Sequence, residues 1–170
     1  DSFFDGGKYD TNKACLQQVE KMLLEGADFI DIGGMSSKPG ADIISIEEEL
    51  SRVIPVIESI HSSFPKAIIS IDTIHSKVAK EAIESGASIV NDISAGKEDD
   101  EMLQTVANLN VPYIAMHMKG KPKDMQTNPI YENVSLEVLD FFIKKVNDCR
   151  KAGIKDIILD VGLGFGKTIE

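Results

Sequence analysis

Hydrophobic and polar positions along the chain follow two different periods. Segments with an apolar residue every three to four positions predict helices, and short, nearly continuous apolar runs predict buried strands. Five strand-like runs occur, FIDIG, AIISID, SIVND, PYIAMH and DIILDVG. Helical patterns separate them, at 11–25, 45–63, 76–85, 99–109 and 135–152. Strands that alternate with helices indicate a parallel sheet covered by helices.

The ends of the expected helices carry recognisable signals. Ser45 and Glu48 form a capping box that opens the second helix. Gly26, Gly86 and Gly153 each follow a helix and precede a strand by two residues, which predicts a left-handed backbone that turns the chain back into the sheet. Pro55 is expected to kink or break the second helix, because proline removes a backbone hydrogen bond there.

Polar side chains stand where each strand gives way to a loop. They are Asp31, Asp72, Asn91 with Asp92, His117 and Asp160. An open doubly wound sheet gathers ligand groups at one switch point, whereas every strand of a (β/α)8 barrel ends at one central site. The even spread therefore predicts an α/β fold of the TIM-barrel type. Because a complete barrel needs about 250 residues, we interpret these as the second to sixth strands of one barrel domain, residues 1–170, incomplete at both ends.

The polar strand ends are also candidates for ligand binding. Asp92, taken alone, could equally be the N-cap of the next helix. Convergence of Asp31, Asp72, Asn91 and Asp160 predicts a buried polar site, and buried carboxylates are costly unless they are paired or hydrogen-bonded. A ligand edge with adjacent N–H groups, such as a 2-amino-pyrimidinone, would satisfy them, as would a divalent cation.

Composition narrows the possible partners. The chain has 170 residues, 42% of them hydrophobic, and a formal net charge of −10, which argues against nucleic acid and anionic membranes as partners. No apolar run reaches the roughly 18–20 residues of a membrane helix. Cys15 and Cys149 are interpreted as helix residues in a reducing cytoplasm. The three histidines show no metal-ligand spacing, and His61 is expected at the surface.

The stretch DVGLGFGKT, residues 160–168, looks at first like a nucleotide-binding loop. A P-loop needs glycine at position 161, where this chain has Val161, and the glycines at 162, 164 and 166 do not fit the dinucleotide pattern either. Lys167 could lend positive charge, but we expect a solvated loop lysine. ATP binding is therefore disfavoured.

Six segments together resemble the dihydropteroate synthases. They are DSFFDGG, DIGGMSSKPGA, SIDT, GASIVNDIS, MHMKGKP and DVGLGFGKT, in the order and spacing of that family from residue 1 to about 168. The resemblance implies a pterin-binding (β/α)8 transferase of folate biosynthesis, a family targeted by sulfonamides. Such enzymes join 6-hydroxymethyl-7,8-dihydropterin pyrophosphate to p-aminobenzoate and release pyrophosphate. It also implies Mg²⁺, with no ligand assignable in this chain, a cytoplasmic location, and a homodimer for the complete protein.

The resemblance assigns roles to residues of this chain. Asp72, Asn91 and Asp160 would hydrogen-bond the pterin, with Met116 packed beside it, and Asp72 would stabilise positive charge developing on the ring. Phe165 would line the pterin and p-aminobenzoate pockets. Two loops would complete the site, with Phe3 and Asp5 closing on p-aminobenzoate and Ser37, Lys38 and Pro39 meeting pyrophosphate and p-aminobenzoate.

Some positions depart from the family pattern, and two other interpretations remain open. Met35 and Lys38 interrupt the usual GGESTRPG, and Val161 replaces a proline; Lys38 lacks the planar fork with which arginine binds phosphate. These changes bear on pyrophosphate affinity more than on pterin recognition. The alternatives are a pterin barrel of the methyltetrahydrofolate–corrinoid methyltransferase type and a non-catalytic fragment that retains pterin contacts only.

Overall fold

The fold is built on one parallel β-sheet of five strands. The computed structural model describes residues 10–35, 44–120 and 130–167. The strands lie side by side in chain order, as β1 (Phe29–Gly33), β2 (Ile68–Asp72), β3 (Ile89–Asp92), β4 (Tyr113–Met116) and β5 (Ile157–Asp160). The helices are α1 (Asp10–Leu24), α2 (Ile46–Ser63), α3 (Ser76–Glu84), α4 (Met102–Leu109) and α5 (Val134–Ala152). Each element predicted from the sequence is present.

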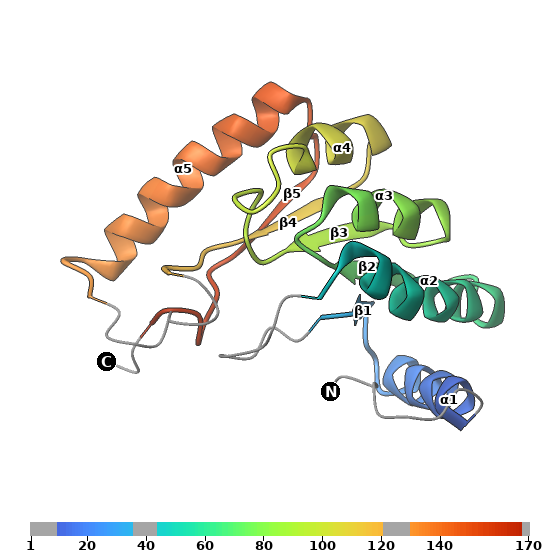
Figure 1. The fold of residues 1–170 in the computed structure, drawn as a ribbon. Coiled ribbons are helices and arrows are strands. Elements are labelled where there is room, and N and C mark those ends of the chain that lie inside the picture. Colours follow the sequence, from blue (N-terminus) through green and yellow to red (C-terminus); the bar gives the residue numbers. More distant parts are fainter. Residues whose placement is uncertain (1–9, 36–43, 121–129, 168–170) are drawn as a thin grey trace.

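The helices form a single layer. Figure 1 shows α2, α3, α4 and α5 in a row along one side of the sheet. Right-handed crossovers combined with a strand order that never reverses place successive helices on the same face. A doubly wound sheet, whose order reverses, would carry helices on both faces. The arrangement therefore matches the wall of a barrel, as the sequence predicts.

The main hydrophobic core fills the space between the sheet and this helix layer. Alternate strand residues point to it, because successive side chains of a strand face opposite sides. Ile69 and Ile71 of β2 are fully buried there, as are Val90 of β3 and Tyr113 of β4. The residues between them point to the opposite face, which carries Asp72 and Asn91. The helices thus hold the sheet while leaving its other face to the polar strand ends.

The helix-end signals act as predicted. The Ser45 hydroxyl accepts a hydrogen bond from the Glu48 N–H at 3.2 Å at the start of α2. Gly26, Gly86 and Gly153 have φ of 95°, 119° and 103°. At Gly86 a side chain would also collide with the His61 ring, whose Cγ lies 2.6 Å from the position a Cβ would take. Glycine is needed there for both reasons.

Two boundary predictions differ from the structure. Of the kink or break expected at Pro55, the break is absent, because helix α2 runs through this residue. Pro55 and Ser51 are exposed, so the Ser51 carbonyl that loses its N–H partner can be hydrated instead. Helix α4 begins at Met102, three residues later than expected. The Asp99 carboxylate accepts the Glu101 N–H at 2.9 Å, just before this helix, and the Ser76 N–H at 2.7 Å, at the start of α3.

Three composition-based predictions can be compared with the structure. Cys15 and Cys149 lie in helices α1 and α5, as expected, and both side chains are buried. His61 is exposed, also as expected. Within residues 10–35, 44–120 and 130–167, no helix has the length and apolar character needed to cross a bilayer.

Candidate active site

The carboxyl ends of the five strands bring the polar residues to one edge of the sheet. Paired residues of parallel strands lie side by side and face the same way. Gly33 pairs with Asp72, and Asp72 pairs with Asn91, so these three form one row across β1, β2 and β3. On the neighbouring strands Met116 pairs with Asp160. The register therefore places the four residues expected to contact the pterin on the face that the helices leave uncovered. We call them the floor residues, and they are Asp72, Asn91, Met116 and Asp160.

Asp72 is the residue whose environment is most unusual. No hydrogen bond from the described part of the chain reaches its carboxylate. Removal from solvent, together with the smaller effect of the negative charges of Asp31, Asp92 and Glu49, raises the pKa of Asp72 to about 7. Gly33 leaves the carboxylate uncovered, since a Cβ at that position would lie 3.5 Å from Asp72 Oδ2. Such a carboxylate is available to a ligand that brings N–H donors.

Asn91 is held in place by a neighbour from β1. Its Nδ2 donates a hydrogen bond to Asp31 Oδ2 at 3.2 Å. Asp31 pairs with Ser70, two residues before Asp72, so it lies one row deeper in the sheet. With its amide N–H engaged in this way, Asn91 presents its carbonyl oxygen as an acceptor. Asp31 is therefore a supporting residue in this geometry.

Two of the carboxylates are not buried, contrary to the sequence-based expectation. Asp31 and Asp160 are exposed. Within these 170 residues, β1 and β5 are the outer strands of the sheet, so each is paired on one side only. Asp160 Oδ1 accepts the Gly162 N–H at 2.9 Å, which shapes the turn after β5.

Asp92 has a structural role that neither sequence interpretation anticipated. It is fully buried, and α4 begins ten residues later, so it is not a helix N-cap. Its carboxylate accepts hydrogen bonds from the N–H and hydroxyl of Ser94, from the Gly96 N–H and from the Tyr113 hydroxyl, at 2.7 to 2.8 Å. Asp92 thus fixes the loop after β3 to β4, on the helix side of the sheet.

An apolar cluster caps the polar floor. We call it the rim cluster, and it consists of Met35, Ile74, Ile93, Met116, Met118 and Phe165. Met116 and Phe165 were predicted, whereas the others were missed. Three of these share a sequence signal: Ile74, Ile93 and Met118 each stand two residues after Asp72, Asn91 and Met116, just beyond the carboxyl ends of β2, β3 and β4. Met35 likewise follows Gly33 by two, so this departure from the family pattern supplies part of an apolar surface.

The glycine-rich loop, residues 162–167, lies against backbone and forms no phosphate cradle. A Cβ at Gly162 would collide with the His117 carbonyl, and one at Gly166 with the Lys119 carbonyl. Both glycines have φ of 64°. Their function is therefore to let this loop pack against the loop that follows β4, and Phe165 between them reaches the rim cluster.

Lys167 is not the solvated lysine that we expected. It is partly buried, and its Nζ lies 2.9 Å from His117 Nδ1 and 3.1 Å from the Gly162 carbonyl oxygen. Carbonyl oxygens of the loop after β4 and of the glycine-rich loop lie close together, and they accept hydrogen bonds from the ammonium group in place of water. A lysine committed in this way is not free to bind nucleotide phosphates, which agrees with the rejection of the P-loop.

The start of the loop after β1 is fixed to α2. Arg52 Nη1 donates to the Gly34 carbonyl at 2.9 Å, and a Cβ at Gly34 would lie 2.9 Å from Val53 Cγ1. Beside it, the fully buried Glu49 contacts His75 Nδ1 through Oε2 at 2.8 Å. The predicted residues Ser37, Lys38 and Pro39 farther along this loop, and Phe3 and Asp5, lie outside the described residues.

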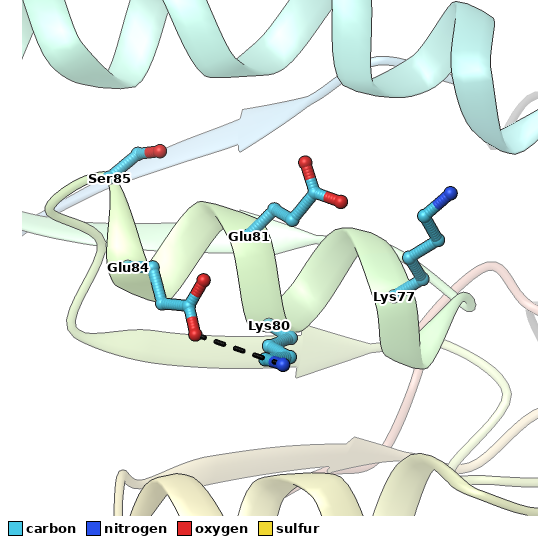
Figure 2. A pocket seen from close by; sticks show the side chains of 5 residues that line it. All are labelled: Lys77, Lys80, Glu81, Glu84 and Ser85. Carbon is cyan, nitrogen blue, oxygen red and sulfur yellow. Dashed lines mark ion pairs between the residues drawn. The ribbon is translucent and has the colours of Figure 1, made fainter.

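Two other features of the described residues do not add to the site. No three His, Cys, Asp or Glu side chains within those residues lie close enough to hold a metal ion. A hollow of about 420 Å³ lies on the outer surface of α3, lined by Lys77, Lys80, Glu81, Glu84 and Ser85 (Figure 2). Lys80 and Glu84 pair across 4.0 Å there. This mixed-charge surface belongs to the helix layer, on the other side of the sheet from Asp72 and Asn91.

Comparison with known proteins agrees with this geometry. The sequence model of a family described as pterin binding enzyme matches residues 1–170. The chain is 46% identical over 172 residues to dihydropteroate synthase from Haemophilus influenzae, an alignment that covers 100% of this chain and 62% of that protein. The chain therefore spans about three fifths of the length of this relative.

Solved structures give the same result for the fold. Yersinia pestis dihydropteroate synthase in a sulfonamide drug complex superposes with a TM-score of 0.90 at 39% identity, covering 99% of this chain and 61% of that one. Xanthomonas albilineans dihydropteroate synthase with 4-aminobenzoic acid superposes with a TM-score of 0.86 at 38% identity, covering 97% and 58%. These relatives are TIM barrels, so the predicted fold class is confirmed. Matched over its whole length by the family model, the chain belongs to the pterin-binding enzyme family.

Proposed function

We propose that this chain is the pterin-binding part of a dihydropteroate synthase. The protein would condense 6-hydroxymethyl-7,8-dihydropterin pyrophosphate with p-aminobenzoate to give 7,8-dihydropteroate and pyrophosphate. The observation that carries the proposal is the pair Asp72 and Asn91, side by side on the uncovered face of the sheet and capped by the rim cluster. The similarity to dihydropteroate synthases supports the choice among pterin-binding enzymes.

The floor residues suit the edge of a pterin ring. The 2-amino-pyrimidinone edge carries adjacent N–H donors, which a carboxylate can accept in pairs. Asp72 would accept them, and the Asn91 carbonyl and Asp160 would accept further N–H groups of the ring. Met116 and Phe165 of the rim cluster would pack against its flat faces. This division of polar edge and apolar faces is typical of small-molecule sites.

The reaction needs stabilisation of charge more than a nucleophilic side chain. The bond between the pterin methylene carbon and the pyrophosphate oxygen breaks, and its electrons leave with pyrophosphate. The arylamine nitrogen then bonds to that carbon and gives up a proton. Ionised Asp72 would stabilise the positive charge that develops on the ring in between. Phe3 and Asp5 would close on p-aminobenzoate, and Ser37, Lys38 and Pro39 would meet it and the pyrophosphate.

The remaining expectations belong to this proposal. Mg²⁺ would accompany the pyrophosphate, but the described residues offer no cluster to hold it, so no step above depends on it. We also propose that residues 1–170 are part of a single barrel domain, and that the complete protein is a cytoplasmic homodimer that binds neither nucleic acid nor membranes.

Calorimetric titration of the chain with the dihydropterin pyrophosphate tests the proposal. The wild-type chain should bind this ligand but not ATP. Asp72→Ala should abolish the heat signal, because it removes the acceptor of the ring N–H groups. Asp156→Ala is the matched control, since Asp156 directly precedes β5, at the end of the strand remote from Asp160, and this variant should bind normally.

Three results would reject the proposal. They are tight ATP binding, unchanged pterin binding by Asp72→Ala, and a folded chain that binds no pterin. Binding of methyltetrahydrofolate in preference to the dihydropterin pyrophosphate would favour the corrinoid methyltransferase type.

A further inference from the structure

We propose that Lys167 is a positioning residue, which holds Phe165 against the rim cluster by fastening the glycine-rich loop to His117. The inference rests on the proposed function only for the identity of the ligand that Phe165 would meet. Lys167 itself would touch no substrate.

The contacts of Lys167 bridge two loops. Its Nζ lies 2.9 Å from His117 Nδ1 and 3.2 Å from the His117 carbonyl oxygen, in the loop after β4. It lies 3.1 Å from the Gly162 carbonyl oxygen and 3.3 Å from that of Phe165, in its own loop. An ammonium group has three N–H donors, so four acceptors share them and none is left for solvent or phosphate.

His117 is suited to act as the fixed partner. An ammonium group cannot accept a hydrogen bond, so His117 must accept at Nδ1 and carry its proton on Nε2. Burial, together with the smaller effect of the charges of Lys167, Lys97 and Lys119, lowers the pKa of His117 to about 4. The ring is therefore neutral near pH 7, and Nδ1 remains an acceptor. Edge-to-face packing on Phe141, with ring centroids 4.9 Å apart, keeps it in place.

The position of Phe165 follows from this attachment. Its N–H donates to the Gly162 carbonyl at 3.0 Å, which closes the loop on itself. The close backbone approaches at Gly162 and Gly166 allow this loop one way of packing on its neighbour. Lys167 supplies the only donors within the described residues that reach both the Gly162 carbonyl and His117 Nδ1. Without it the Gly162 carbonyl would keep the Phe165 N–H, but His117 Nδ1 would lose the donor that joins the two loops and would be better satisfied by water, so the loop would lift.

A fluorescence experiment can test the loop directly, without any ligand. The chain contains no tryptophan, so Phe165→Trp introduces a single tryptophan at the position in question, which can be excited selectively over the three tyrosines. Adding Lys167→Met should move its emission to longer wavelength and increase quenching by acrylamide, because the indole leaves the rim cluster. Lys155→Met is the matched control. It removes a lysine at the opposite end of β5, one that bonds Asn110 Oδ1 at 2.8 Å, and should change neither quantity.

Ligand binding then separates positioning from general stability. In a chain that keeps the natural Phe165, Lys167→Met should weaken binding of the dihydropterin pyrophosphate about tenfold, equivalent to about 1.4 kcal/mol. The far-ultraviolet circular dichroism should stay unchanged, and Lys155→Met should bind normally. Lys167→Gln, a shorter neutral side chain that keeps two donors, provides a second variant if the methionine variant does not fold.

Two outcomes are decisive. Unchanged emission and quenching in a folded Lys167→Met or Lys167→Gln chain would overturn the proposed position of Phe165. Emission that shifts as expected, in a chain whose parent binds no pterin, would support the positioning by Lys167 while rejecting the proposed function.

Discussion

At the scale of single residues, Asp72 combines the features that a pterin-binding carboxylate requires. It lies beside Asn91 in the sheet register, Gly33 leaves it uncovered, and no described residue donates to it. Its pKa of about 7 shows that the fold favours the neutral acid. An unligated Asp72 is thus a source of instability that a ligand with N–H donors would relieve.

Asp72→Asn should stabilise the unligated chain in a pH-dependent way. The folded-state pKa of about 7 lies above the unfolded value, so the folded chain binds the extra proton, and stability falls as pH rises between the two values. The neutral asparagine avoids this loss. The variant should therefore exceed the wild type by on the order of 2 kcal/mol at pH 8, allowing for partial solvation, and by little at pH 4.

Urea denaturation at the two pH values measures this difference. The same variant should lose pterin affinity, since the amide no longer offers two acceptor oxygens. Equal stability of the two chains at pH 8 would contradict the role assigned to the environment of Asp72.

At the scale of elements, the sequence was informative wherever a local rule operates. Periodicity found each strand and helix, and glycines at 26, 86 and 153 marked the helix-to-strand turns. Features that depend on distant partners were not predictable. The bond from the Ser76 N–H to Asp99 joins the start of α3 to the segment before α4, and the role of Asp92 depends on Tyr113. The hydrogen bonding of Lys167 depends on His117, fifty residues away in the sequence.

The glycine-rich loop provides a test at this scale. Gly162→Ala should sharply reduce pterin binding, because its methyl group would collide with the His117 carbonyl and displace Phe165. Gly164→Ala is the matched control: it also has positive φ, 86°, but among the described residues no heavy atom other than those of its chain neighbours lies within 4 Å of its Cβ position. Both variants incur left-handed strain of about 1 kcal/mol, so the difference between them isolates the collision.

Titration with the dihydropterin pyrophosphate, alongside urea denaturation, checks this prediction. Equal affinities for Gly162→Ala and Gly164→Ala would show that the packing of this loop against His117 does not matter for the ligand.

At the scale of the whole molecule, the two faces of the sheet are used differently. One is sealed by the helix layer and the main core (Figure 1). The other exposes apolar side chains such as Phe29, Ile68 and Ile158 below the polar strand ends. The sequence predicted which polar residues share that face, because strand ends and alternation are local properties. It could not predict how far each side chain is exposed, which depends on the strands on either side, and within these 170 residues Asp31 and Asp160 lie on strands that are paired on one side only.

The most direct test of the central claim is the pKa of the Asp72 carboxyl group, with and without ligand. Carbon-13 labelling of aspartate, with Asp72→Asn to assign the signal, allows an NMR titration of the free chain and of the chain saturated with dihydropterin pyrophosphate. We predict a value of about 7 in the free chain. In the complex it should fall toward the ordinary value of about 3.9, because ring N–H donors favour the carboxylate. A pKa that stays the same under saturating ligand would contradict the claim that Asp72 receives the pterin.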